Sequence, residues 1–193
     1  MEKALRGMQA FPSDKIEQCL QYFAANFGKS RFSHIRHFVA NIFCLAGTEA
    51  DEYYDAILEQ YSSACRALYL QATIAPGFLN FITKLTGDKY VASGSVQDEL
   101  QWVFAQRGID RYFKGIFGAP HPKSGIVADI QKNNRGKKIV FIGDSESDFD
   151  ASKENNVDFV YYSKFSLVQD KMMALAGEHG FTVLDEFPTQ ENV

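Results

Sequence analysis

The spacing of apolar residues changes once along the chain. In the first part, apolar residues recur at intervals of three and four, as at Ile16, Leu20 and Phe23, which is the period of amphipathic helices. In the second part, short apolar runs alternate with helical patterns. The pattern therefore predicts a helical region at residues 1–71 and an α/β region at residues 72–193.

The second region contains several short apolar runs that we expect to be strands. Alternation of strands with helices is typical of a parallel sheet with right-handed crossovers. The sequence thus predicts an α/β protein with a Rossmann-like parallel sheet core and a separate α-helical subdomain. The expected strands are Tyr90–Ser93, Gly115–Ala119, Ile139–Asp144, Phe159–Ser163 and Phe181–Leu184.

The segment KKIVFIGDSESD, residues 137–148, gives the strongest indication of chemistry. An apolar strand ends on Gly143, and Asp144 and Asp148 follow four residues apart. A glycine at a buried strand end lets another group approach the backbone closely, and open α/β sheets bind ligands at the carboxyl ends of their strands. Carboxylates there suit Mg²⁺, which prefers oxygen ligands. Ser145 with Asp148 also fits a helix capping box, which is the purely structural alternative.

A second segment, KYVASGSVQDEL, follows another apolar strand with two serines. The Ser93 hydroxyl and the Gly94 N–H lie where a strand gives way to a helix, and backbone N–H groups at a helix start bind anions. Ser95 with Asp98 fits a capping box instead. Ser93 is therefore the better phosphate candidate of the two serines.

A third segment, GAPHPKSGIVADI, places a lysine just ahead of a helix. Pro120 and Pro122 hold the backbone extended, and Lys123 precedes Ser124, the expected helix cap. A lone lysine is usually a solvated surface charge. A lysine held between a proline-rich loop and a helix start instead offers a fixed positive charge to a phosphoryl group.

The order of these three segments resembles the haloacid dehalogenase (HAD) superfamily of phosphatases and phosphomutases. Ser93 resembles its second motif, Lys123 its third, and residues 143–148 its fourth. Residues 76–85 are similar to the helix before the second-motif strand, and residues 180–187 to the closing strand. The resemblance implies a Mg²⁺-dependent phosphatase that acts on a small phosphorylated metabolite, phosphoglycolate- or phosphosugar-like, with a phosphomutase as an alternative.

The resemblance also implies a role for each matched residue. Asp144 would ligate Mg²⁺, while Asp148 would either assist at the metal or orient Lys123. Lys123 and the Ser93 hydroxyl would hold phosphoryl oxygens, and the Gly94 N–H would add a donor. These positions form the predicted active site.

Members of the superfamily open with a strand that carries DxD, in which the first Asp is the nucleophile and the second is the general acid–base. Residues 1–20 have a helical pattern instead, and covalent phosphoryl transfer needs that nucleophile. The resemblance places the opening strand between the second- and fourth-motif strands. Its absence would leave buried backbone groups unpaired, at about 1–3 kcal/mol each, against a total stability of roughly 5–15 kcal/mol.

We therefore expect a chain that is inactive and marginally stable as written, through a truncation or a misplaced start. The alternative is a non-catalytic phosphate-binding or interaction protein that has lost the nucleophile. An in-frame DxD preceded by four or five apolar residues in the coding DNA upstream of Met1 would favour the enzyme.

The helical region has one charged segment, FGKSRFSHIRHF, in which Gly28 breaks the helix. A run of charges is usually a solvated face. The functional alternative is a cap loop in which Lys29 and Arg31 close over the core site, exclude water and bind the non-reacting part of an anionic substrate. The resemblance implies that this region sets substrate choice, which makes Arg31 the specificity candidate.

Composition narrows the choice of partners. A net charge of −4 without a basic stripe argues against nucleic-acid binding. The sequence shows neither a signal peptide nor an apolar run of membrane-spanning length. Cys19, Cys44 and Cys65 lack metal or redox spacing, so we expect them to be core residues of a reduced, cytoplasmic protein.

Overall fold

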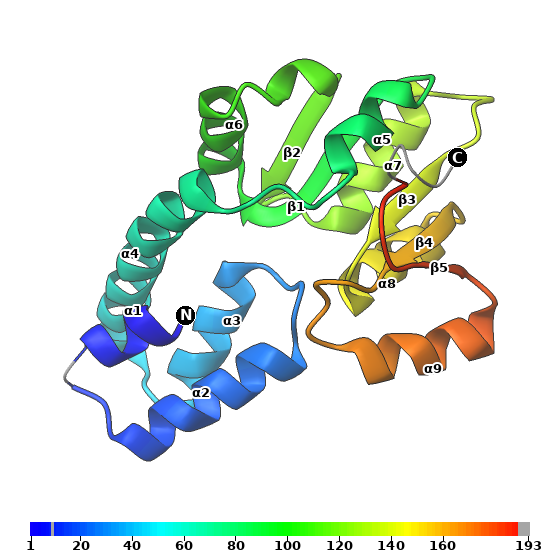
Figure 1. The fold of residues 1–193 in the computed structure, drawn as a ribbon. Helices are drawn as coiled ribbons and strands as arrows, with labels where there is room; N and C mark the ends of the chain where they lie inside the picture. The colour runs from blue at the N-terminus through cyan, green and yellow to red at the C-terminus, as the bar shows by residue number, and fades with distance from the viewer. Residues whose placement is uncertain (9, 189–193) are drawn as a thin grey trace. The chain divides into compact units, whose positions relative to one another are not determined.

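The computed structural model describes residues 1–8 and 10–188 and divides into two compact units (Figure 1). One unit, Met1–Ala72, is helical, and the other begins at Thr73 and holds the described strands. Parallel strands separated by helices confirm the predicted fold class. No helix within the described ranges is both long and apolar enough to cross a membrane.

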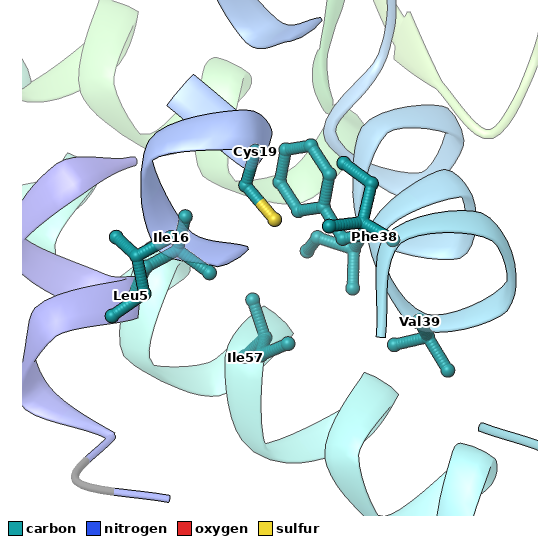
Figure 2. Close-up of a cluster of buried hydrophobic side chains, with 8 residues drawn as sticks. Leu5, Ile16, Cys19, Phe38, Val39 and Ile57 are labelled. Carbon is teal, nitrogen blue, oxygen red and sulfur yellow. The ribbon is translucent and has the colours of Figure 1, made fainter. Parts of the chain in front are cut away.

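The helical unit packs its amphipathic helices around one apolar core. Figure 2 shows side chains from separate helices gathering there: Leu5, Ile16, Cys19, Phe38, Val39 and Ile57. Within this core, Ile35, Phe38 and Ile42 recur at intervals of three and four residues, so burial of an apolar stripe stabilises this stretch of helix. The helices are α1 (Glu2–Gly7), α2 (Ser13–Ala25), α3 (Arg31–His37), the π-helix η1 (Phe38–Ile42) and α4 (Gly47–Gln71).

His34 is a polar residue enclosed in this unit. It is 1% exposed, its ring lies 4.7 Å from that of Phe23, and its Nδ1 atom has no hydrogen-bond partner among the described residues. Burial, the largest cause, together with the nearby Lys29 and His37 lowers the pKa of His34 to about 4. The folded unit therefore holds a neutral imidazole at neutral pH.

We expect His34 to make stability depend on pH. The folded state resists protonation, so the unfolded chain takes up the proton first as the pH falls below the ordinary pKa of 6.5. The stability that His34 contributes is complete above that pH and is lost progressively down to pH 4, by about 3 kcal/mol. Urea unfolding followed by circular dichroism should show this loss in the native chain and a flatter profile in His34→Phe. Equal profiles in the two proteins would contradict a buried neutral imidazole.

The second unit alternates helices and strands. This alternation is the one that the sequence predicted. Its helices are α5 (Phe78–Lys84), α6 (Gln97–Gln106), the 3-10 helix η2 (Asp110–Tyr112), α7 (Lys123–Asn133), α8 (Glu146–Glu154) and α9 (Gln169–His179). Its strands are β1 (Tyr90–Val96), β2 (Gly115–Ala119), β3 (Val140–Gly143), β4 (Asp158–Tyr162) and β5 (Thr182–Leu184).

The strands of this unit form two separate parallel sheets. In one, β1 pairs with β2, with Val91 opposite Ile116. In the other, β4 lies between β3 and β5, with Ile142 opposite Val160. Among the described strands, β1 and β3 share no ladder. The sheet that the sequence predicted is therefore divided between its second and third strands.

Two predicted helix caps are wrong. Ser95 lies inside β1, because pairing with β2 resumes at Val96 after an irregularity that follows Ala92, and α6 begins only after Val96. Ser124 lies inside α7, which begins at Lys123 directly after Pro122. Proline suits a helix entry because its fixed φ and missing N–H cost nothing there.

The expected burial of the cysteines is confirmed for two of the three and is wrong for the third. Cys19 and Cys65 are buried, whereas Cys44 is exposed. Cys44 follows the π-helix with a φ of 60°, in the turn where the chain leaves the helix.

Candidate functional site

Asp148 is the most enclosed carboxylate at the carboxyl end of β3. It lies in the first turn of α8 with a side chain 6% exposed. Its Oδ1 accepts a hydrogen bond from Lys123 Nζ at 2.6 Å, and its Oδ2 accepts from Ser145 Oγ at 2.6 Å and from the Asp144 N–H at 3.2 Å. Both oxygens are therefore occupied, which compensates the cost of burying the charge.

Lys123 opens α7 and reaches across to the start of α8. Its side chain is 13% exposed, and its Nζ also donates to Ser147 Oγ at 3.0 Å. These contacts fix the ammonium group in one place. They favour the positioning role for Asp148 over the role of metal ligand, which the sequence left open.

Gly143 makes the close packing at this strand end possible. A Cβ atom at this position would lie 2.3 Å from the Cβ of Asp148, so only glycine fits. The sequence predicted a close approach here, and the structure identifies the approaching group. The capping-box alternative does not hold, because Ser145 stands at the N-cap of α8 but donates its hydroxyl to the Asp148 carboxylate.

Asp144 is the carboxylate of the site whose ionisation is opposed by its surroundings. Burial, the largest cause, and the negative charge of Asp148 together raise the pKa of Asp144 to about 6, while the positive charge of Lys123 acts in the opposite direction. The Asp144 carbonyl accepts a hydrogen bond from Ser166 Oγ at 2.6 Å, which holds the loop in place. Negative charge thus exceeds what the lysine offsets, and a cation would be stabilised here.

The donors at this strand end fit Mg²⁺ with a single protein carboxylate. The described residues contain no group of three His, Cys, Asp or Glu side chains that could hold a metal. Mg²⁺ is commonly bound through one or two carboxylates together with waters and phosphate oxygens. Asp144 suits that role, because the two oxygens of Asp148 already accept hydrogen bonds.

A cavity of about 630 Å³ brings these residues together with β1. Its lining includes Ser93, Lys123, Asp144 and Asp148. Ser93 Oγ accepts a hydrogen bond from the Ser95 N–H at 3.1 Å, which orients the hydroxyl at the strand end. The second-, third- and fourth-motif residues predicted from the sequence therefore face one space. Gly94 follows Ser93 in β1, and its predicted donor role stays a prediction.

The other predicted contacts to substrate lie in the helical unit. Arg31 is 4% exposed, its Nη1 donates to Ser62 Oγ at 2.8 Å, and its guanidinium lies 5.0 Å from the Tyr61 ring. Lys29 is exposed and donates to Asn26 Oδ1 at 2.7 Å. These contacts give Arg31 a structural role within its own unit. The substrate-binding role of both residues stays a prediction.

Sequence reasoning missed two serines that shape the site. Ser147 accepts from Lys123, and Ser166 donates to the Asp144 carbonyl. Ser147 belongs to the recognised segment, so its position next to the carboxylates was an available signal. Ser166 lies after β4 and carries no local pattern, so only the folded chain reveals it.

Comparisons with family models and with curated protein sequences find no match. Among solved structures, a predicted phosphatase from Clostridium acetobutylicum has a TM-score of 0.68 at 14% identity, covering 94% of this chain and 82% of that chain. A haloacid dehalogenase-like family hydrolase from Streptococcus pneumoniae has a TM-score of 0.63 at 14% identity, with coverages of 94% and 81%.

A third solved structure extends the likeness to a protein whose substrate class has been suggested. A provisionally assigned phosphoglycolate phosphatase from Lactobacillus delbrueckii subsp. bulgaricus has a TM-score of 0.65 at 16% identity, covering 95% of this chain and 84% of that chain. Identities this low establish shared architecture and leave activity to the site. The chain therefore shares the haloacid dehalogenase-like fold of these structures, as its motifs predicted.

Proposed function

We propose that this chain carries the phosphoryl-binding part of a Mg²⁺-dependent, HAD-type phosphatase site for a small phosphorylated metabolite. The observation that supports it is the Lys123–Asp148 pair, which shares a cavity with Ser93 and Asp144. A phosphoglycolate- or phosphosugar-like compound is the proposed substrate class. The buried cysteines carry no disulfide, which fits the reduced cytoplasm where we place the protein.

Each residue of the site has a distinct task in this proposal. Lys123 presents a fixed positive charge to the phosphoryl oxygens, and because Asp148 holds it in advance, little reorganisation is needed when substrate binds. The Ser93 hydroxyl donates a further hydrogen bond. Asp144 would hold Mg²⁺, which when bound neutralises charge on the phosphoryl group.

The nucleophile is the part that the described cavity does not supply. Three carboxylates line it: Asp88, Asp144 and Asp148. Asp148 is hydrogen-bonded to Lys123, Asp144 is assigned to the metal, and Asp88 accepts hydrogen bonds from two lysines. We therefore infer that residues 10–188 bind a phosphoryl group without accepting it. A non-catalytic phosphate-binding protein and a phosphomutase remain the alternatives, because they require the same binding groups.

Anion binding should depend on Lys123. We expect isothermal calorimetry with phosphate or vanadate to show a loss of affinity of about tenfold to a hundredfold in Lys123→Ala, because a charge-assisted hydrogen bond disappears. Lys132→Ala, an exposed lysine on the same helix, is the matched control and should bind as the native chain does. An unchanged affinity in Lys123→Ala would move the phosphate site elsewhere.

A further inference from the structure

Strand β1 bulges away from β2 at the residues that were predicted to bind phosphate. Pairing is regular up to Ala92 and resumes at Val96, four residues later, while β2 advances by only two residues. Residues 93–95 therefore stand opposite a single residue of β2, Gly118. A bulge of this kind bends a strand locally and re-aims its side chains, often next to an active site. Here the re-aimed segment contains Ser93.

The bulge leaves a buried N–H group of β2 without a regular ladder partner. In a parallel pair, the backbone groups of every second residue face the neighbouring strand. The Lys114 N–H donates to the Lys89 carbonyl at 2.8 Å, so Lys114 faces β1, and Ile116 and Gly118 follow it at steps of two. Both of these residues are buried. Buried backbone groups need partners, so the position opposite Gly118 has to be filled.

The side chain of Gln97 fills this position. Gln97 is the first residue of α6, which packs against β2 (Figure 1). Its Oε1 accepts a hydrogen bond from the Gly118 N–H at 2.6 Å, and its Nε2 donates to the Ile116 carbonyl at 2.7 Å. A carboxamide carries both a donor and an acceptor, as a peptide group does. The Gln97 side chain thus takes the place of a backbone group of β1 in the ladder.

Gly118 allows the bulge to pass close to β2. A Cβ atom at this position would lie 2.4 Å from the Ser95 carbonyl oxygen and 3.1 Å from Gln97 Cα. Any side chain here would push these backbone atoms outward. The glycine and the glutamine together therefore determine how the bulge stands against β2.

The shape of the bulge bears directly on the Ser93 hydroxyl. Ser93 lines the cavity together with Lys123 and Asp144. Its Oγ accepts a hydrogen bond from the Ser95 N–H at 3.1 Å, which closes the bulge on itself. A hydroxyl that accepts in this way keeps its own proton for another acceptor. A displacement of Ser95 would turn the Ser93 hydroxyl away from the direction in which it can donate to a phosphoryl oxygen.

We propose that Gln97 is a positioning residue for phosphoryl binding, which holds the bulge at residues 93–95 so that the Ser93 hydroxyl is presented to the cavity. The inference rests on the proposed phosphoryl-binding function. Ser93 is the residue that touches the ligand, and Gln97 acts through it. A donor that is fixed in advance favours binding, because little ordering is left to be done when the anion arrives.

Calorimetry with inorganic phosphate on the full chain tests this inference. Gln97→Met keeps the length of the side chain and removes both hydrogen bonds, so we expect the affinity for phosphate to fall about tenfold as the Ser93 contact weakens. Gln101→Met is the matched control. Gln101 is exposed on the same helix and donates to the same Ile116 carbonyl at 3.1 Å. The control should bind phosphate as the native chain does.

Gly118→Ala provides an independent route to the same loss. Its methyl group would displace the Ser95 carbonyl while the Gln97 side chain is retained, so phosphate affinity should again fall about tenfold. Gly115→Ala is the control on the same strand. A Cβ atom there would first meet the Phe117 ring at 2.6 Å, and this ring is 37% exposed and can turn aside. Affinity in Gly115→Ala should be unchanged.

Amide hydrogen exchange without phosphate separates positioning from general stability. In Gln97→Met, exchange should accelerate about tenfold at the Ser95 and Gly118 amides. It should stay unchanged in β4, which belongs to the other sheet. A glutamine with a merely structural role would instead lower protection throughout the unit, and phosphate affinity of the folded protein would not change.

The outcomes distinguish this inference from the proposed function. Native phosphate affinity in Gln97→Met and Gly118→Ala, with a loss in Lys123→Ala, would overturn the positioning role and leave the proposed function in place. Unchanged exchange at Ser95 in Gln97→Met would also overturn the positioning role, independently of any ligand. A native chain that binds no phosphate would overturn the proposed function, and the role of Gln97 with it.

Discussion

Joining an apolar strand that ends in DxD to this chain should convert an inactive protein into a Mg²⁺-dependent phosphatase. We expect residues 1–193 alone to show no turnover of p-nitrophenyl phosphate with Mg²⁺. The extended protein should hydrolyse it, with a turnover number on the order of 1 s⁻¹ or more. The thermal transition of the extended protein should also be cooperative, with a higher midpoint than that of the shorter chain.

The physical reason is that one strand would pair with both β1 and β3, which share no ladder among the described strands, and would also supply a carboxylate that can act as the nucleophile. A parallel strand between β1 and β3 would end where Ser93 and Asp144 line the cavity. The first Asp of the added motif would therefore lie beside Asp144, so that Mg²⁺ is held between carboxylates. Lys123, already fixed by Asp148, would face the transferring group.

Changing the first Asp of the added motif to Asn separates chemistry from folding. This variant should keep the raised thermal midpoint and lose activity by a factor of roughly 10³–10⁶, as removal of a nucleophile does in other enzymes. Turnover by residues 1–193 alone, abolished in Asp144→Ala, would show instead that a described carboxylate acts as the nucleophile. An extended protein that folds well yet hydrolyses no phosphorylated metabolite would make the binding-protein alternative correct.

The fold was accessible from sequence because its periodicities are local. The three- and four-residue spacing through Ile16 and Leu20 identified the helical unit, and apolar runs such as Ile139–Ile142 identified strands. Helix starts were less predictable. Ser95 has the residue type of a cap, yet its segment extends β1 because pairing with β2 outweighs the local preference of one residue.

The individual residues of the site could be predicted from sequence, but the hydrogen bonds between them could not. The segment around Gly143 predicted carboxylates at a strand end, and the proline-rich loop before Lys123 predicted a fixed positive charge. That Lys123 donates to Asp148 depends on two helix starts brought together by the fold, 25 residues apart in the chain. The contacts of Arg31 with Ser62 and the Tyr61 ring could not be predicted either, because these residues lie about 30 positions further along the chain; its predicted role in substrate binding stays a prediction.

Removing one member of the Lys123–Asp148 pair should destabilise the second unit more than removing both. We expect Lys123→Met to lower the free energy of unfolding by about 3–5 kcal/mol, because it leaves a buried carboxylate without its cation. Adding Asp148→Asn should restore part of this loss, since the neutral amide needs no counter-charge. The single tryptophan, Trp102, lies in α6 of this unit, so its fluorescence during urea unfolding reports the relevant transition.

A neighbouring ion pair provides the matched control for this cycle. Glu146 stands two residues before Asp148 on α8, and its carboxylate lies 2.6 Å from Lys171 Nζ of α9, but the side chains of Lys171 and Glu146 are 52% and 38% exposed. Water screens such a pair, so its coupling energy should stay below about 1 kcal/mol, whereas the 13% and 6% exposed Lys123 and Asp148 should couple by about 2–3 kcal/mol. Equal coupling in the two pairs would mean that water reaches Lys123 freely. The lysine would then be a mobile surface charge, and the fixed phosphoryl-binding cation on which the proposed function rests would be lost with it.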